Sequence, residues 1–472
     1  TLRSYIRKTE PGFDIYFNDK NIAKKYVKKY RRHIVKKNVT VTGENINYVL
    51  QPQVSFVLMN QKNGKVLALV GGRGNKTGSR TLNRATDSLR QPGSTFKILS
   101  AYLPAFDTAG MSLATYEKDE KYYYPGTNTQ VHNWNGNAYK GYVSLREAIY
   151  NSMNVIAVKT LEKVTPKVAY DYLTNLGITT LVDKRTGSNG KVYSDISLPM
   201  ALGGLTDGVT NLQLTAAYAA IANNGIYNEP SLYTRILDHD GNVLLEKKPE
   251  KRQVMKDSTA YFLTSAMEDV LTKGTGKPAR FTTIDMAQAG KTGTTSSDID
   301  LWFEGYTPYY TAGIWGGWDL NKDQADTVYH KNIWKTIMEK VHTAKKKKKK
   351  DFKIPDSVTE ATICTSCGKL AISGVCSAYG AAKTEYFAKD MLSQGYCTCH
   401  SAPKPKPEPE PGTNDNPAQN DNTVSPDSAG TDASESSVAP QAATPSDTGT
   451  DGSAQAPADE GTVTQNYNDI AE

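Results

Sequence analysis

A serine and a lysine lie three residues apart in the segment Gln91–Leu99. Pro92-Gly93 ends a loop and a helical pattern follows, so we expect Ser94 in the first turn of a helix with Lys97 on the same face. A serine hydroxyl becomes a good nucleophile when a base takes its proton, and lysine can be that base where burial or a second cation lowers its pKa. The alternatives are an N-cap serine or a chance match.

A second polar pair, Ser152 and Asn154, falls between two predicted helices. The first helix begins at a capping box, Ser144 with Glu147, and the second begins just after Asn154. A hydroxyl and an amide at such a junction can point into a cleft. The alternative is a helix end satisfied by local side-chain hydrogen bonds.

A third segment, Lys291-Thr292-Gly293-Thr294, follows a predicted strand. It offers a cation, hydroxyls and bare backbone to a bound peptide, and Gly293 leaves room for backbone to approach closely. A phosphate-binding loop would need glycine where Asp285 stands, so nucleotide binding is disfavoured. Lys-Thr-Gly also occurs at residues 76–78, in a predicted exposed loop, so the tripeptide alone decides nothing.

The order of the three motifs carries more information than any one of them. Ser94, Ser152 and Lys291 follow one another at separations of 58 and 139 residues. In this combination residues 50–335 resemble the penicillin-binding transpeptidase family, and most nearly the transpeptidase part of class A (bifunctional) penicillin-binding proteins of Gram-positive type. Further similar segments are Gly64–Ala68, Arg90–Ser94, Asn133-Trp134, Ala201–Gly204 and Asp300–Phe303.

The resemblance implies an α+β fold of the penicillin-binding transpeptidase and serine β-lactamase type. Its central, mostly antiparallel sheet would be flanked by helices and accompanied by an all-helical subdomain. The residue patterns agree, because they predict strands at 54–59, 66–70 and within 287–318, and helices from Ser144 and Thr210 between them.

The resemblance also implies a role for each motif residue. Ser94 would attack the penultimate D-alanine of a peptidoglycan stem peptide, and Lys97 would accept its proton. Ser152 and Lys291 would relay a proton to the departing D-alanine, and Asn154 would hold the substrate amide. Thr292 and Thr294, beside Gly293, would bind the terminal carboxylate, and the Ser94 and Thr294 amides would form an oxyanion hole. Trp134 would form a wall of the substrate groove.

The implied product is a cross-link between stem peptides, and β-lactams would be trapped on Ser94. No cofactor or nucleic-acid partner is implied. A D,D-carboxypeptidase or β-lactamase with the same residues, and a penicillin-binding sensor or scaffold, remain alternatives. Met153 stands where class A β-lactamases carry aspartate, and a Glu-x-x-Leu-Asn segment is not found, which disfavours a β-lactamase.

The flanking segments differ in composition from residues 51–335. Residues 1–50 are basic, contain a predicted helix at 21–35, and resemble a connector left from a missing glycosyltransferase half. We expect residues 336–400 to form a basic linker, with the lysine run 345–350, and a small cysteine-containing module. Residues 401–472 are acidic and rich in Pro, Ser and Thr, which predicts disorder.

The chain has 472 residues and a net charge of +7, although residues 401–472 hold two Lys against thirteen Asp and Glu. The first 400 residues are therefore strongly basic. This positive charge either suits contact with anionic wall polymer or lipid, or it is ordinary solvated charge. No apolar run approaches the about 18 residues of a membrane span. We expect a longer parent protein, anchored N-terminally at the extracytoplasmic face of the membrane.

All five cysteines follow residue 363. Cys364-x-x-Cys367, Cys376 and Cys397-x-Cys399-His400 contain enough zinc ligands for one site. Disulfides are the competing interpretation, since the implied activity works outside the cytoplasm. The odd number and irregular spacing favour one or two disulfides, and no metal site is assigned.

Overall fold

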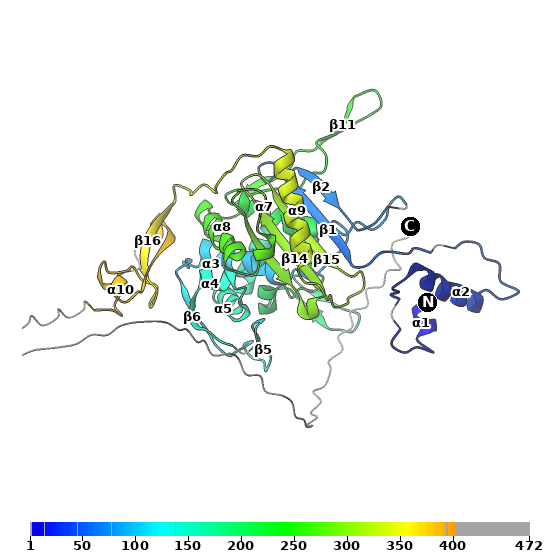
Figure 1. Cartoon of the computed structure of the whole chain (residues 1–472), viewed down its shortest axis with the longest axis horizontal. Coiled ribbons are helices and arrows are strands. Elements are labelled where there is room, and N and C mark those ends of the chain that lie inside the picture. Colours follow the sequence, from blue (N-terminus) through cyan, green and yellow to red (C-terminus); the bar gives the residue numbers. More distant parts are fainter. Residues whose placement is uncertain are drawn as a thin grey trace, which may run out of the picture. The chain divides into compact units, whose positions relative to one another are not determined.

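A computed structural model describes residues 2–13, 15–44, 46–76, 78–136, 138–392 and 395–401. Its centre is a five-stranded antiparallel sheet in the order β13-β14-β15-β1-β2 (Figure 1). The strands are β1 (Gln53–Met59), β2 (Val66–Val70), β13 (Ala289–Thr294), β14 (Asp300–Tyr306) and β15 (Thr311–Gly317). The predicted sheet, built from both ends of the central region, is therefore confirmed.

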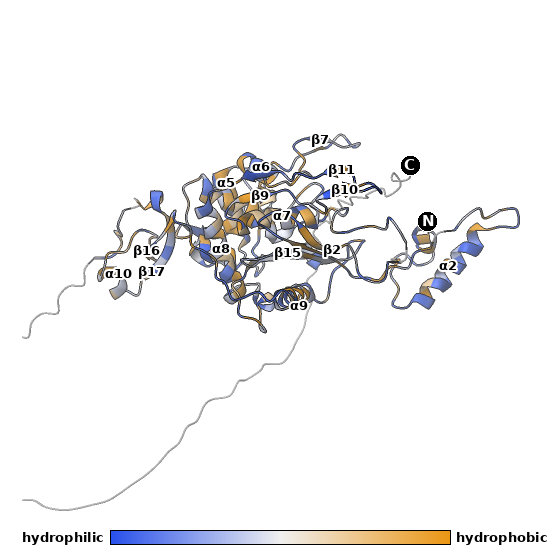
Figure 2. Cartoon of the chain, turned by 90° about the horizontal axis from the view of Figure 1, so that it is seen from above, coloured by the Kyte–Doolittle hydropathy of each residue, from blue (hydrophilic) through white to orange (hydrophobic). Residues whose placement is uncertain are grey.

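Alternate residues of β1 pack on opposite faces of the sheet, as the period of two requires. Val57 and Met59 join the larger core, which includes residues of α7 (Asn211–Ala222) and α8 (Asp257–Thr272). Phe56 and Leu58 join a smaller core under α9 (Tyr329–Ala344). Figure 2 shows α7 and α9 on opposite sides of β15. Both faces are covered, so the three central strands are almost entirely buried.

The predicted helix starts are present. The Ser144 hydroxyl accepts a hydrogen bond from the Glu147 amide at the start of α4. At the start of α7, Thr210 and Gln213 form a capping box, in which each side chain bonds the backbone amide of the other. The helical subdomain consists of η2 (Ile98–Tyr102), α3 (Leu103–Asp107), α4 (Leu145–Tyr150), α5 (Asn154–Val164) and α6 (Pro166–Asn175). Its long helix α5 packs against η2, which follows the segment that carries Ser94.

Short antiparallel pairs surround this centre. They are β3 (Tyr116–Asp119) with β6 (Gly141–Ser144), β4 (Tyr122–Tyr123) with β5 (Gln130–Val131), β7 (Arg185–Thr186) with β8 (Val192–Tyr193), β9 (Ile226–Asn228) with β12 (Lys251–Gln253), β10 (Arg235–Leu237) with β11 (Val243–Glu246), and β16 (Val358–Cys364) with β17 (Ala382–Ala388).

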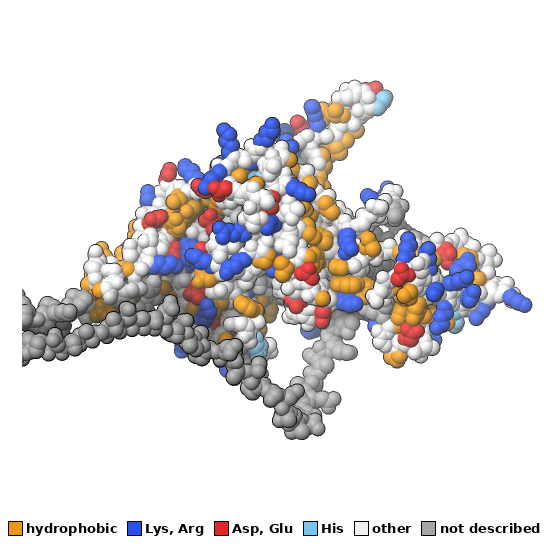
Figure 3. All heavy atoms as spheres, in the orientation of Figure 1, with side chains coloured by type: hydrophobic (Ala, Val, Ile, Leu, Met, Phe, Trp, Pro, Cys, Tyr) orange, Lys and Arg blue, Asp and Glu red, His pale blue; other side chains and the backbone are white. Residues whose placement is uncertain are grey.

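The N-terminal segment contains α1 (Leu2–Ile6) and α2 (Lys20–Ile34), which confirms the predicted helix. Asp19 caps α2, because its carboxylate accepts the Asn21 and Ile22 amides. Figure 3 shows Lys and Arg side chains gathered over these helices. The positive charge expected around residues 24–37 is therefore exposed here.

Helix α9 runs through residue 335, where the sequence analysis placed the end of the transpeptidase part. Trp334 and Met338 of this helix are fully buried against the sheet, and the Trp334 ring donates to the Ala312 carbonyl. The lysine run that follows is mostly exposed, yet Lys349 pairs with Asp285 and Lys347 lies over the Tyr309 ring. It therefore follows the domain surface.

The sequence also led to expectations about the C-terminal tail and about membrane-spanning segments. The tail predicted to be disordered lies, from residue 402 onward, outside the described residues. Within the described part of the chain, no helix combines the length and the apolar character that crossing a membrane requires.

Candidate active site

Ser94 lies in a single 3₁₀ turn, Gly93–Thr95, rather than in the expected α-helical turn. The Thr95 hydroxyl donates to the Pro92 carbonyl at 2.7 Å and closes the turn. Lys97 follows this turn in helical backbone, so about one helical turn separates it from Ser94. Ser94 is partly exposed, whereas Lys97 is fully buried.

The Ser94 turn is pressed against the end of strand β13. Gly93 has φ +52°, and a Cβ at this position would lie 2.7 Å from the Thr294 carbonyl oxygen. A Cβ at Gly293 would lie 2.6 Å from the Pro92 carbonyl oxygen. Only glycine fits at both positions, and this contact brings the backbone at Ser94 next to that of Thr294.

Ser152 connects the two lysines of the site. It lies between α4 and α5 with φ +55°, a left-handed conformation that is costly for a residue with a side chain. Lys97 Nζ donates to the Ser152 carbonyl at 2.6 Å and contacts its hydroxyl at 3.3 Å. Lys291 Nζ lies 2.9 Å from the same hydroxyl. The strained backbone thus places one hydroxyl between two amines.

Asn154 completes this network at the start of α5. Its Oδ1 accepts from Lys97 Nζ, and its Nδ2 donates to the His132 carbonyl at 2.6 Å. Its backbone amide donates to Asn133 Oδ1 at 2.8 Å, and Asn133 Nδ2 donates in turn to Asp119. Sequence reasoning gave no role to Asn133 or Asp119, which hold Asn154 in place.

Burial sets the charge state of the two lysines. Both are fully buried, and within the described ranges neither forms an ion pair. Burial first, and then the charge of Lys291, lower the pKa of Lys97 well below its usual value. Burial, followed by the charge of Lys331, lowers the pKa of Lys291 to about 7. The lowered pKa means that Lys97 loses its proton more readily than an ordinary lysine, so its amine is suited to accept a proton from a neighbouring hydroxyl.

The outer residues of the site lie along β13 and beside α4. The hydroxyls of Thr292 and Thr275 are 2.7 Å apart, while Thr294 is exposed at the strand end. Trp134 is 69% exposed, and its ring N–H donates to the Asn151 carbonyl at 2.9 Å. Lys76, of the second Lys-Thr-Gly, is exposed as expected.

The structure thus brings the three sequence motifs together. Hydrogen bonds join Lys97, Ser152, Asn154 and Lys291, and the contact of Gly93 with Thr294 adds the Ser94 turn. A partly exposed serine hydroxyl in a turn next to this amine network suits nucleophilic attack on a carbonyl group, and backbone amides can stabilise the oxyanion that forms.

Two family descriptions match the chain. Residues 54–339 match the penicillin-binding protein transpeptidase domain, and residues 354–402 match the C-terminal domain of penicillin-binding protein 1A. Together these matches extend over the sheet, the helical subdomain and the cysteine-containing module.

Curated relatives agree with the match to the penicillin-binding protein transpeptidase domain. Penicillin-binding protein 1A of Clostridium tetani is 31% identical over 382 residues, covering 76% of this chain and 46% of the relative. Penicillin-binding protein 1A/1B of Bacillus subtilis is 31% identical over 366 residues, covering 74% of this chain and 38% of the relative. The chain spans less than half of either relative.

The fold is shared with solved structures. The crystal structure of penicillin-binding protein 1A from Haemophilus influenzae gives a TM-score of 0.60 at 24% identity, covering 72% of this chain and 54% of that chain.

Proposed function

The chain belongs to the penicillin-binding protein transpeptidase family, and on that basis we propose that it is a serine D,D-transpeptidase that cross-links peptidoglycan stem peptides. The observation that carries this proposal is the network in which Ser152 lies between the Lys97 and Lys291 amines, next to the Ser94 turn. Acyl transfer needs this combination of a hydroxyl, a neutral base and a proton relay.

In the first half-reaction, Ser94 Oγ attacks the carbonyl carbon of the penultimate D-alanine, and its proton passes to the Lys97 amine. The oxyanion is stabilised by the backbone amides of Ser94 and Thr294, which the Gly93 contact holds side by side. The carbon–nitrogen bond then breaks, and the terminal D-alanine leaves with a proton delivered through the Ser152 hydroxyl.

Substrate positioning falls to the groups around this centre. Asn154, held by His132 and Asn133, presents its amide to the peptide backbone of the substrate. Thr292 and Thr294 flank Gly293 at the strand end, where they bind the terminal carboxylate near the Lys291 charge. Trp134 forms an exposed wall of the groove.

In the second half-reaction, the amine of another stem peptide attacks the Ser94 ester. A new amide bond forms as the attacking amine gives a proton to Lys97, which became neutral when the D-alanine left. The ester bond breaks, and Lys97 passes that proton to the Ser94 oxygen. A β-lactam enters the same path through its ring carbonyl, but its leaving group stays tethered, so the acyl-enzyme is long-lived.

We also propose that this chain is part of a longer, membrane-anchored protein that carries a peptidoglycan glycosyltransferase and acts at the extracytoplasmic face of the membrane. The greater length of the curated relatives supports this proposal. The basic face of α2 suits contact with anionic lipid or wall polymer.

The test is an acceptor assay on the purified chain with a stem pentapeptide ending in D-alanyl-D-alanine. We expect a cross-linked product when an amine acceptor is present, and its loss in Lys291→Ala but not in Lys76→Ala, which alters the second Lys-Thr-Gly. Release of D-alanine to water alone would indicate a carboxypeptidase. A penicillin adduct without turnover of any peptide would indicate a sensor or scaffold.

A further inference from the structure

The cysteine-containing module gathers its possible metal ligands at one point. Cys364 ends β16, Cys376 lies in α10 (Val375–Ala378), and Cys397, Cys399 and His400 lie in the last described segment. All five cysteines, each of which the structure describes, are free thiols. The structure thus contains none of the disulfides favoured by the sequence, and its sulfurs converge on a common centre, with Cys399 Sγ 3.2 Å from Cys397 Sγ and 3.6 Å from Cys364 Sγ.

The spacing of the ligand atoms suits a single ion. The ligand atoms of Cys364, Cys376, Cys397 and His400 all lie within 4.8 Å of one another. Cys364 Sγ is 3.4 Å and Cys397 Sγ is 3.7 Å from His400 Nδ1. Zinc bonds to sulfur at about 2.3 Å and to nitrogen at about 2.0 Å, so a tetrahedral site places its ligand atoms roughly 3.5–3.8 Å apart.

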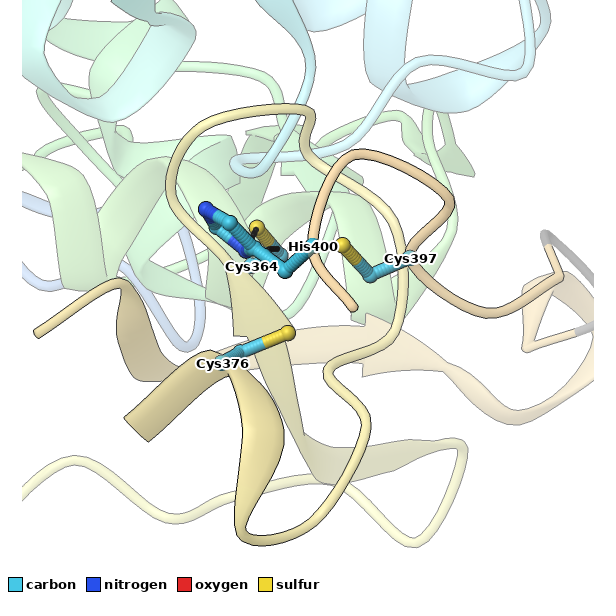
Figure 4. A group of neighbouring side chains, drawn as sticks. All are labelled: Cys364, Cys376, Cys397 and His400. Atoms are coloured by element: carbon cyan, nitrogen blue, oxygen red, sulfur yellow. Dashed lines mark hydrogen bonds between the residues drawn. The ribbon is translucent and has the colours of Figure 1, made fainter. Parts of the chain in front are cut away.

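Burial favours these four residues over the other possible set, which replaces Cys376 and His400 with Cys367 and Cys399. Cys364, Cys376 and Cys397 are buried, whereas Cys367 is partly exposed and Cys399 is exposed. A structural zinc site is closed to solvent, so the buried thiols are the better ligands. Figure 4 shows Cys364 and His400 side by side, with the Cys397 thiol directed toward them and Cys376 nearby.

Neighbouring groups orient these ligands. The backbone amide of Ile372 donates to Cys376 Sγ at 3.4 Å. Amide donors of this kind offset thiolate charge and fix the direction of the lone pairs. The His400 ring stacks on Tyr379 at 4.6 Å, which leaves Nδ1 facing the sulfurs.

The β16–β17 hairpin packs on the main domain through Ile363 and Phe387, whereas the part of the module that carries the ligands has only a small apolar core of its own. Among the described residues, its internal buried cluster consists of Cys364, Cys376, Ala381 and Cys397, with Cys367, Ala371 and Ile372 packed around them. Domains of this size seldom fold on so few apolar side chains and normally need a metal or disulfides. The thiols that would form a core are the same groups that would bind a metal.

We propose that Cys364, Cys376, Cys397 and His400 bind one structural zinc ion. Binding releases the three thiol protons, and the neutral imidazole coordinates through Nδ1. The ion joins β16, α10 and the last described segment. It thereby fixes the β16–β17 hairpin, whose Glu385 pairs with the buried Arg146 at the start of α4. The site lies in a separate module from Ser94, so this inference does not depend on the proposed transpeptidase activity.

The experiment measures zinc in the full chain, purified under reducing conditions, equilibrated with zinc and freed of excess metal. We expect about one zinc per chain, and a loss of at least about tenfold in zinc affinity for Cys364→Ser, Cys376→Ser, Cys397→Ser and His400→Ala. Cys367→Ser and Cys399→Ser are the matched controls and should retain zinc. Cobalt in place of zinc should give the strong absorption of thiolate-to-metal charge transfer.

Three results would overturn the proposal. Wild-type protein that holds no zinc would exclude the site. Retention of zinc by Cys376→Ser and His400→Ala, with its loss in the two controls, would show that the ligand assignment is wrong. A non-reduced mass lower by one or two pairs of hydrogens would show disulfides instead. Penicillin labelling of every variant reports whether the remainder of the chain is folded.

Discussion

The active site and the cysteine-containing module bring distant residues together in different ways. A five-stranded sheet and two hydrophobic cores bring Ser94, Ser152 and Lys291 together. These three side chains themselves contribute little to holding the fold together. In the module, the converging thiols are themselves the buried core. Substitutions at the active site should therefore change chemistry before stability, whereas substitutions at the module should change stability first.

The two regions meet at Arg146. Its guanidinium pairs with Glu385 of the module at 2.6 Å and with Asp269 of α8 at 3.1 Å, and it also donates to the Ser265 carbonyl. Arg146 is in α4, which ends next to Ser152. The module is thus connected to the helix that positions the relay hydroxyl.

Replacing the base should give the largest effect. Lys97→Met keeps most of the side-chain volume but removes the proton acceptor, so we expect the rate of penicillin acylation to fall by about 10²- to 10⁴-fold. The melting temperature should not fall, because a buried amine is replaced by an apolar group. Lys163→Met, on an exposed position of α5, should acylate at the wild-type rate. A large loss of stability in Lys97→Met would contradict the division between the two regions.

Removing the connection between the regions should cost stability. Arg146→Met removes the close partner of the buried Glu385, which keeps only Lys383 at 3.9 Å, while Asp269 keeps Lys273. We therefore expect a loss of about 3 kcal/mol in the free energy of unfolding. The control is Arg185→Met, which breaks a comparable pair with Asp207 at the surface and should cost at most about 1 kcal/mol. Denaturant unfolding measures both, and equal losses would refute the structural role of Arg146.

The pH dependence of acylation should separate the two lysines. The lowered pKa of Lys97 means that its amine stays unprotonated to a lower pH than that of an ordinary lysine and gains a proton as the pH falls. We therefore expect the acylation rate to decline toward acid. Lys291→Met removes a nearby positive charge, which should raise the pKa of Lys97 and move this decline to higher pH. A decline that stays in place or moves to lower pH would disprove the coupling.

The smallest effect is expected at the rim of the site. Trp134→Ala removes an exposed ring, so we expect KM for the stem peptide to rise about two- to tenfold with kcat unchanged. Trp134→Phe keeps a ring and should recover part of the loss. A fall in kcat at constant KM would instead show that Trp134 acts through its hydrogen bond to Asn151.

Much of the fold could be predicted, since local signals mark its elements. The Asn63-Gly64 turn and the Ser144 and Thr210 caps are each encoded within a few residues. The order of the three motifs likewise identified the residues that meet at the site.

The remaining features depend on tertiary contacts. The 3₁₀ turn at Ser94 forms where Gly93 meets the Thr294 backbone, about two hundred residues away in sequence. Asn133 acts through bonds to Asp119 and Asn154, which no local pattern joins. The cysteine spacing indicates ligands, but only the folded hairpin shows that they share one centre.

The most direct test of the proposed active site is the position of the penicillin adduct. Labelled penicillin, followed by intact-mass measurement and peptide mapping, should give one long-lived adduct per chain, on the peptide that contains Ser94. Ser94→Ala should give no adduct, and Ser100→Ala, a buried serine in the same segment, should label like the wild type. Labelling of Ser94→Ala at the wild-type level, or an adduct on another residue, would contradict the account.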